Sequence, residues 1–328
     1  MLYSLNPPLF LLAPMDDVTD TVFRQIIFGC SPPDISFSEF VNVDGLISAG
    51  RQRLINKLFK SDKEAPLIAQ LWGLEPDNFY LVSKQISLGD VARELGIDNR
   101  YAGIDLNMGC PAKDVVKTGA CSALINNRTL AEDIIKATKR GSAGILPISV
   151  KTRVGYDRID LTWIEFLLNQ GLDMLTVHLR TTREMSRVEP HYDLLTDIIE
   201  LRDKVAKQTL IIANGDIANR THGQEIINKF HIDGVMIGRG VFQDPFAFSG
   251  VDQWSQTSPQ ERIELFVKHL TTYKLWADNP NKGVKRLNKY AKIYLNGFYA
   301  AKGLRESLAK LNTVDEMIGT IDSFVLSS

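Results

Sequence analysis

Short apolar segments recur along the first three quarters of the chain, and most of them are continuous runs rather than alternations of apolar and polar positions. Continuous runs of Ile, Val and Leu are typical of strands that are buried on both faces of a parallel sheet. The pattern predicts eight strands, at Leu9–Met15, Ile35–Val41, Pro66–Gly73, Tyr101–Asn107, Leu146–Val154, Met174–Leu179, Thr209–Asn214 and Gly234–Gly238.

The stretches between these segments have a helical period. Ala131–Arg140, Thr162–Asn169 and Thr221–Phe230 each place apolar residues on one face and polar residues on the other. Regular alternation of strand and helix indicates repeated βαβ units, and eight units are the number that closes a (β/α)8 TIM barrel. A doubly wound sheet usually has a glycine-rich turn after its first strand. Residues 13–17 contain no glycine, so we favour the barrel within the α/β class.

The pattern changes near residues 243–245, and no strand-like run follows Ser249. Ser258, Pro259 and Glu261 match a helix start, with an N-cap, a proline at the first position and a capping box. We therefore predict a barrel domain over residues 1–247, followed by a smaller all-helical domain over residues 248–328.

Composition narrows the class of protein. The chain has 328 residues, of which 44% are hydrophobic and 23% are charged, and this excludes disorder as the dominant state. A net charge of -1 excludes a uniformly basic coat but not a local basic patch. Three cysteines cannot build a disulfide scaffold, and the early apolar run Leu9–Met15 is too short for a bilayer. We expect a cytoplasmic protein with no membrane partner, acting as a monomer.

Polar side chains follow nearly every predicted strand. The active site of a (β/α)8 barrel lies at the carboxyl ends of its strands, so these side chains are expected to meet at one rim. The residues at the ends of these strands are, in chain order, Pro14 and Met15, Ser38 and Glu39, Gln70, Asp105, Asn107 and Cys110, Lys151 and Arg153, His178 and Arg180, Asn214 to Asp216, and Gly238 to Gly240.

The last two strand ends predict a phosphate site. Asn214-Gly215-Asp216 and the pair Gly238-Arg239 occupy the two loops that form a phosphate cup in many barrels. Glycine lets backbone N–H groups approach an anion, and an arginine adds charge. The alternative is that these glycines only make tight turns.

Lys151 and Cys110 carry the candidate chemistry. Lys151 lies in an apolar strand, where an unpaired buried charge is costly. It can pair with an anionic or electron-rich group, form a Schiff base, or extend outward to solvent. A cysteine with an ordinary pKa of about 8.5 is mostly a thiol at neutral pH. Cys110 can therefore donate a proton, act as a nucleophile beside a base, or be a small buried hydrophobe. Cys30 and Cys121 fit the buried role. Cysteine and histidine spacings match no metal site, so we expect no metal.

Several of these segments together resemble the tRNA-dihydrouridine synthase family. They are residues 11–20 with Phe23 and Arg24, then Asn107-Met-Gly-Cys-Pro111, Val150-Lys-Thr-Arg153, Val177-His-Leu-Arg-Thr181, Ala213-Asn-Gly-Asp216 and Ile237-Gly-Arg-Gly240. The resemblance runs over about residues 9–245, and the Asn-x-Gly-Cys-Pro motif is its most specific part. One departure is Asp17, where the family usually has glycine.

The resemblance implies an FMN enzyme that reduces the C5–C6 double bond of uridines in tRNA, with NADPH or NADH as reductant. It implies that reduced FMN gives hydride to C6 and that Cys110 is the acid that protonates C5, with Asn107 beside the uracil. The flavin contacts that it implies are Pro14, Met15, Gln70, Lys151 and His178 for the ring and ribityl chain, and Asn214, Gly215, Asp216, Gly238 and Arg239 for the tail and phosphate.

The C-terminal region has a basic helix face. Between Lys282 and Lys310 there are eight basic residues and one acid, Glu306. At 100° per residue one face of this helix carries Lys282, Lys285, Arg286, Lys289 and Lys292, and the opposite face is apolar. Solvated faces normally mix charges, so we predict contact with RNA phosphates. Glu39 and Arg180 are further candidates for RNA contact at the rim. The alternative is an ordinary solvated face.

Three other functions remain to be compared with a tRNA-uridine reductase. An FMN dehydrogenase of a free pyrimidine, similar to dihydroorotate dehydrogenase, would share the cysteine, the lysine and the phosphate cup but would not need the basic helix. A non-redox RNA-binding protein with this fold would be expected to lack Cys110 or Lys151. A Schiff-base aldolase would have no use for the Gly-Cys-Pro turn.

Overall fold

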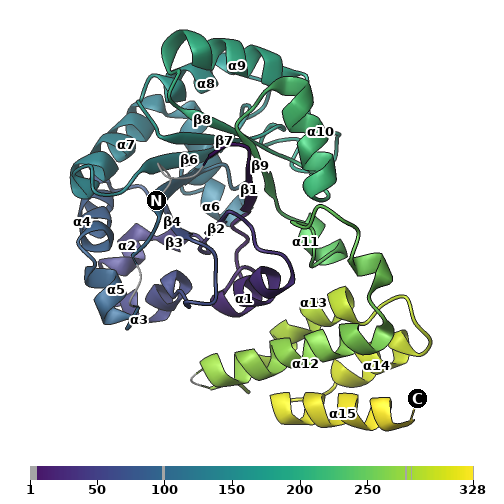
Figure 1. Cartoon of the computed structure of the whole chain (residues 1–328). Helices are drawn as coiled ribbons and strands as arrows, with labels where there is room; N and C mark the ends of the chain where they lie inside the picture. Colours follow the sequence, from purple (N-terminus) through teal and green to yellow (C-terminus); the bar gives the residue numbers. More distant parts are fainter. Residues whose placement is uncertain (1–5, 98–99, 278, 282, 328) are drawn as a thin grey trace.

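Parallel strands form the centre of the molecule. The computed structural model describes residues 6–97, 100–277, 279–281 and 283–327. Within these residues the strands follow the order β2-β1-β9-β8-β7-β6-β5-β4, and the pairing of β2 with β4 closes the ring. The strands are β1 (Leu9–Leu12), β2 (Ile35–Phe37), β4 (Leu67–Trp72), β5 (Gly103–Met108), β6 (Ile148–Arg153), β7 (Met174–His178), β8 (Leu210–Asn214) and β9 (Gly234–Ile237). The predicted (β/α)8 barrel is confirmed (Figure 1).

One predicted strand is divided. The segment Ile35–Val41 contributes β2 to the ring, and after a short irregular stretch the two-residue β3 (Val41–Asn42) pairs only with the end of β4. The Ser38 hydroxyl accepts a hydrogen bond from the backbone N–H of Gln70 at 2.9 Å. The irregular stretch therefore stays attached to the neighbouring strand and turns Glu39 toward the rim.

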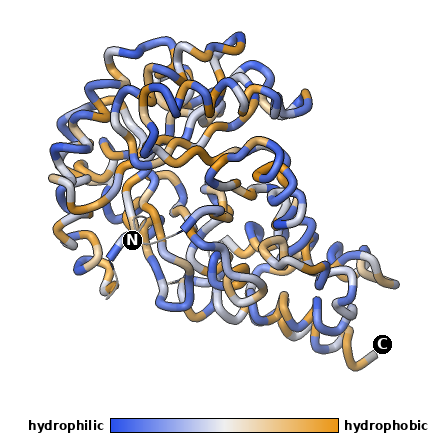
Figure 2. Tube along the Cα trace, turned by 45° about the horizontal axis from the view of Figure 1, so that its top comes forward, coloured by the Kyte–Doolittle hydropathy of each residue, from blue (hydrophilic) through white to orange (hydrophobic). Residues whose placement is uncertain are grey.

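Helices surround the ring as the alternation predicts (Figure 1). The longer ones are amphipathic, and hydrophobic and hydrophilic positions alternate along the outer trace in Figure 2. The helices of the barrel are α1 (Thr21–Cys30), α2 (Val43–Leu46), α3 (Arg51–Leu54), α4 (Pro76–Ser87), α5 (Asp90–Glu94), α6 (Lys113–Val116), α7 (Arg128–Ser142), α8 (Leu161–Leu168), α9 (Leu194–Val205), α10 (Arg220–Phe230) and α11 (Gly240–Gln243). Short 3-10 turns are η2 (Ile55–Leu58), η3 (Cys121–Asn126) and η4 (Trp254–Gln256).

Four further helices lie beside the barrel, next to α1 and α11 (Figure 1). They are α12 (Pro259–Trp276), α13 (Val284–Tyr294), α14 (Ala301–Leu308) and α15 (Val314–Ser327). The predicted start of α12 is confirmed, because Ser258 and Glu261 form a reciprocal capping box. Tyr290 of α13 stacks on Phe23 of α1 with ring centroids 5.3 Å apart, so aromatic packing joins the helical region to the barrel. The domain boundary at residue 247 stays a prediction.

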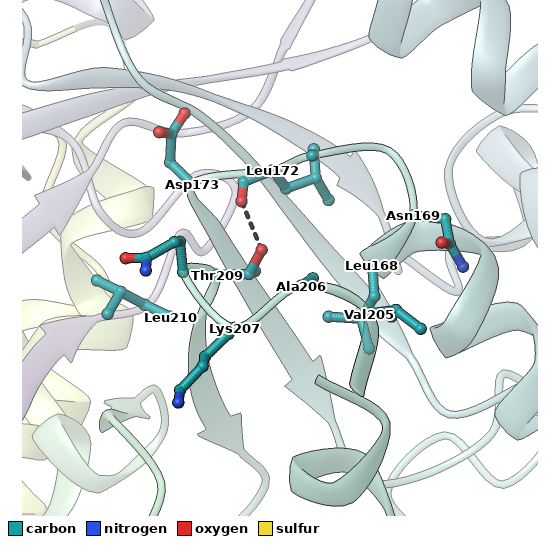
Figure 3. A pocket seen from close by; sticks show the side chains of 11 residues that line it. Leu168, Asn169, Leu172, Asp173, Val205, Ala206, Lys207, Thr209 and Leu210 are labelled. Carbon is teal, nitrogen blue, oxygen red and sulfur yellow. Dashed lines mark hydrogen bonds between the residues drawn. The ribbon is translucent and has the colours of Figure 1, made fainter. Parts of the chain in front are cut away.

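A wide pocket opens at the amino-terminal ends of the strands, away from the expected rim. It has a volume of about 670 Å3 and is lined by the turns that precede β7 and β8 (Figure 3). The Thr209 hydroxyl donates to the Leu172 carbonyl at 2.7 Å and ties these turns together. Positions at this end of a barrel serve stability. In the described part of the chain, no helix combines the length and apolar content needed to cross a membrane.

Candidate active site

A pocket of about 270 Å3 opens at the carboxyl ends of the strands. It lies between the loop after β1 on one side and the ends of β6, β7, β8 and β9 on the other. Its lining residues are Ala13, Pro14, Met15, Pro111, Lys151, Arg153, His178, Met185, Ser186, Asn214, Gly215, Asp216, Ile217, Gly238 and Arg239.

Nine of the ten residues expected to hold a cofactor line this pocket, although they lie at the ends of five different strands. The exception is Gln70, which is fully buried below it in the barrel interior. Sequence reasoning did not assign a role to Arg153, Met185 or Ser186, which also line the pocket. Arg153 was visible as a polar residue at a strand end, whereas the loop that carries Met185 and Ser186 gave no periodic signal.

The middle of the pocket is electropositive. Burial holds the pKa of His178 well below its usual range, and the nearby charges of Lys151, Arg153 and Arg180 lower it further. The imidazole is therefore neutral at pH 7. Burial also lowers the pKa of Lys151 to about 8, with the charge of Arg153 adding to the effect. Lys151 is still mostly an ammonium at neutral pH, and a pocket with this charge favours an anionic or electron-rich ligand.

Asp216 organises the end of the pocket that the sequence predicts to bind phosphate. Its two carboxylate oxygens accept hydrogen bonds from Arg180 and Arg239, and these bonds lower its pKa. The Arg239 side chain remains 59% exposed, so it can also reach a ligand. Gly215 has φ of 132°, and a Cβ atom there would lie 3.2 Å from Pro190 and 3.3 Å from His178. Glycine is therefore required where the backbone approaches the pocket.

Arg180 has a different environment from the one expected of an RNA contact. Its side chain is only 1% exposed, and its Nε donates to the Val188 carbonyl at 2.6 Å. Its Nη1 and Nη2 groups contact His178 and Asp216, so the guanidinium holds two residues that line the pocket. Its contact with RNA stays a prediction.

The turn after β5 presents Cys110 beside the pocket, and the next residue, Pro111, lines it. The Asn107 Oδ1 atom accepts hydrogen bonds from the backbone N–H groups of Gly109 at 3.1 Å and Cys110 at 2.9 Å. A Cβ atom on Gly109 would lie 3.1 Å from the Thr152 backbone, so this close approach to β6 requires glycine. Burial raises the pKa of the half-buried Cys110 thiol, which therefore stays protonated at neutral pH.

Arg153 connects this turn to the opposite side of the pocket. Its Nε donates to the Gly109 carbonyl at 2.9 Å, and its Nη1 donates to the carbonyls of Thr181 at 2.9 Å and Met185 at 3.0 Å. The loop after β7 and the turn after β5 are thus held by one guanidinium.

Of the other two cysteines, Cys30 is half-buried like Cys110, and Cys121 is buried. Cys121 is fully buried and has φ of 53°, an uncommon conformation for a residue other than glycine. Burial raises its pKa well above the ordinary value, and burial raises the pKa of Cys30 to about 12. Both side chains are thiols at neutral pH, as expected for packed cysteines.

The pocket fits a phosphorylated aromatic cofactor such as FMN. One end offers Arg239 and the backbone of Gly215 and Gly238 for a phosphate, and the other end offers Lys151, neutral His178 and the apolar side chain of Met15. This is the donor set that a flat, electron-rich ring with an anionic tail needs. The expected contact of Gln70 with the flavin stays a prediction.

Two of the predicted RNA-binding residues, Arg286 and Lys289, lie where α13 contacts the barrel loop at Asp17, which is called the seam below. Lys285, Arg286 and Lys289 are exposed on α13, whereas Lys282 lies outside the described residues. The Lys289 ammonium donates to the Asp17 carbonyl, and Arg286 Nη1 lies 3.8 Å from the Asp17 carboxylate. Asp17 has φ of 57°, so it occupies the left-handed region that explains why glycine is usual there. These two cations therefore touch the loop that carries Met15.

Glu39 also lies at this seam and not on open surface. It is 5% exposed and accepts a hydrogen bond from the Asp17 N–H at 2.7 Å. Burial raises the pKa of Glu39 to about 7, although Lys57, 3.6 Å away, opposes the shift. One carboxylate oxygen from each of Glu39, Asp16 and Asp17 lies within 4.8 Å of the other two. Lys57 is paired with both Glu39 and Asp16, so this acidic group already has a cation. The expectation of no metal stays a prediction.

Comparisons with known proteins identify the family of this chain. The sequence model of the family described as "Dihydrouridine synthase (Dus)" matches residues 11–326. A Staphylococcus epidermidis protein named "Probable tRNA-dihydrouridine synthase" is 40% identical over 324 residues, which cover 98% of this chain and 95% of that protein. A Bacillus subtilis protein named "Probable tRNA-dihydrouridine synthase 2" is 38% identical over 324 residues, covering 98% and 95%.

A solved structure supports the fold alone. Histamine dehydrogenase from Rhizobium sp. 4-9 aligns with a TM-score of 0.52 at 12% sequence identity, over 80% of this chain and 48% of that one. The match of the family model to nearly the whole chain and the identity to the two bacterial proteins carry the assignment. This chain belongs to the dihydrouridine synthase family.

Proposed function

We propose that this protein reduces the C5–C6 double bond of specific uridines in tRNA to dihydrouridine. The observation that carries the proposal is the position of a protonated cysteine, Cys110, on a rigid turn beside an electropositive pocket. The family membership and the names of the two bacterial relatives support tRNA as the substrate. We further propose that the pocket binds FMN, that NADPH or NADH is the reductant, and that the protein acts as a cytoplasmic monomer.

When bound and reduced, FMN would supply the hydride for C6, and the residues of the chain would supply the rest of the chemistry. Addition of hydride at C6 leaves enolate-like charge at C5 and O4 of the uracil. The Cys110 thiol donates its proton to C5, which completes the net addition of two hydrogens. Because its pKa is raised, the thiol is kept as an acid and not lost to the thiolate form.

Three other groups prepare this step. Asn107 holds the turn by accepting the Gly109 and Cys110 N–H groups, so the thiol does not have to be ordered during the reaction. Lys151 places a positive charge beside the pocket, where it stabilises an anionic ring. Asp216 fixes Arg239 at the phosphate end.

RNA is proposed to bind across the exposed basic residues of α13. Lys285 is free of ion pairs in the described structure, and Arg286 and Lys289 are exposed at the seam. Such contacts neutralise phosphates and orient the RNA without reading its sequence. A uridine within folded tRNA must also leave its stack to enter a barrel mouth.

The test is anaerobic reoxidation of the reduced protein. Unmodified tRNA is expected to restore the oxidised flavin absorbance, whereas fully modified tRNA and free orotate are not. Reoxidation by orotate would assign the protein to free-pyrimidine metabolism instead. Purified protein with no flavin absorbance and no affinity for added FMN would contradict the cofactor assignment.

A further inference from the structure

A chain of buried polar side chains lies below the pocket, and it starts at a carboxylate. Asp105 of β5 is fully buried and accepts hydrogen bonds from Gln70 Nε2 at 2.7 Å and from the Ser149 hydroxyl at 2.5 Å. Gln70 Oε1 in turn accepts a hydrogen bond from Asn107 Nδ2 at 3.1 Å. Asn107 is the residue that holds the Cys110 turn, so the chain connects Asp105 to that turn.

The direction of these hydrogen bonds follows from the chemistry of the first member. An ionised carboxylate can only accept, so Gln70 must direct its NH2 group toward Asp105 and its oxygen toward Asn107. Asn107 must then donate through Nδ2, which leaves Oδ1 for the backbone N–H groups of Gly109 and Cys110. A donor in place of Asp105 would favour rotation of the Gln70 amide, and a rotated Gln70 would present N–H groups to Asn107.

The surroundings keep Asp105 ionised at neutral pH. Burial raises its pKa to about 6, and the bonds from Ser149 and Gln70 and the charge of Lys151 limit the rise. Burying a carboxylate in a barrel is costly, and an apolar residue could fill the same space. The buried charge of Asp105 is connected to the turn that carries Cys110, and its cost indicates that it has a function there.

We propose that Asp105 is a positioning residue that sets the hydrogen-bond direction through Gln70 and Asn107 and thereby holds the Gly109–Cys110 turn at the pocket rim. Its effect on reduction rests on the proposed function of Cys110. Its effect on the turn does not depend on that function, because every hydrogen bond from Asp105 to the turn is formed between residues of the protein itself.

Hydrogen exchange of the Gly109 and Cys110 amides tests the proposal directly. Asp105→Asn keeps the side-chain volume but removes the charge and replaces one acceptor oxygen by an NH2 group, so an ionised carboxylate no longer fixes the Gln70 amide. We expect both amides to exchange about tenfold faster, because they lose a stable acceptor. Ser149→Ala is the matched control, since it removes the other donor to Asp105 without reversing the chain. In that variant the exchange of both amides is expected to change less than about twofold.

Gln70→Met is the second variant and is decisive if Asp105→Asn does not fold. It nearly preserves volume, keeps Asp105, and removes the link to Asn107, so the same acceleration is expected. Wild-type exchange of Gly109 and Cys110 in either folded variant would overturn the proposal, as would equal acceleration in Asp105→Asn and Ser149→Ala.

A kinetic measurement addresses the consequence for catalysis. Asp105→Asn is expected to slow tRNA-driven reoxidation about tenfold while the Kd for tRNA stays unchanged, because the hydrogen-bond chain ends at the Cys110 turn and includes none of the basic residues of α13. The exchange experiment uses no RNA. A failure of tRNA to reoxidise the wild-type protein would therefore contradict the proposed function and leave the role of Asp105 in the turn to be judged by exchange alone.

Discussion

Arg24 and Glu64 form an ion pair in which both side chains are fully buried, and this pair provides the sharpest stability prediction. Arg24 Nε lies 2.5 Å from Glu64 Oε2, and the guanidinium also donates to the carbonyls of Thr19 at 2.5 Å and Phe59 at 2.6 Å. Thr19 bonds to Met15, whose side chain lines the pocket. The substitution Glu64→Gln keeps the shape of the side chain but leaves the guanidinium without its counter-charge.

The expected loss follows from burial. Removing one partner of a buried ion pair costs about 3–5 kcal/mol, because the remaining charge has no compensation. An unfolding entropy of about 2.1 cal/mol/K per residue gives about 0.7 kcal/mol/K for 328 residues. Glu64→Gln should therefore lower Tm by about 4–7 °C if the chain unfolds as one unit.

The matched control is Glu94→Gln. Glu94 pairs with Arg51 at 2.7 Å, but its side chain is 43% exposed, and exposed pairs contribute less than about 1 kcal/mol. Thermal and urea unfolding of the wild type and both variants at pH 7 measure the difference. Equal losses in the two variants would refute the reasoning that burial, and not the ion pair as such, determines the cost.

Three other outcomes are expected. Cys110→Ala should keep bound flavin but slow its reoxidation by unmodified tRNA by about 100-fold or more, as expected for loss of a general acid; wild-type turnover would remove the acid assignment. Because the pKa of Lys151 is about 8, its ammonium is present below that pH and lost above it. Reoxidation should therefore slow as pH rises through about 8, and Lys151→Arg, which stays charged, should abolish that decline; an unchanged profile would assign it to another group. Alanine at Lys285, Arg286 and Lys289 together should weaken tRNA binding and reduce the slope of log K against log salt by about 2, from loss of about three phosphate contacts. An unchanged slope would exclude this face of α13.

Much of the architecture could be predicted from local patterns. Continuous apolar runs placed all eight barrel strands, because a parallel strand buried on both faces has no polar side to show. The capping box at Ser258 and Glu261 placed the start of α12, since its hydrogen bonds join residues three apart. The division of one segment into β2 and β3 was not predicted, because apolar content alone does not mark where a strand leaves the ring.

The sequence predicted which residues line the candidate site, but not which residues they bond to. Strand order alone brings the ends of β1, β6, β7, β8 and β9 to one rim, which is why nine expected residues line the pocket. The partners of those residues could not be predicted. Arg180 and Glu39 were predicted at or near the rim as candidates for RNA contact. The structure shows that Arg180 pairs with Asp216 and that Glu39 accepts a hydrogen bond from Asp17, whereas their contact with RNA stays a prediction.

The sequence by itself determined the eight strands, the helical C-terminal region, the Cys110 turn and the basic face of α13. Each depends on periodicity or on residues close together in the chain. Only the tertiary structure decided that Asp105 meets Gln70 and Ser149, that Arg24 meets Glu64, and that α13 touches the loop of Asp17. These contacts join residues from 35 to 272 positions apart. Such contacts depend on the register of neighbouring strands and on helix docking, which no local pattern records.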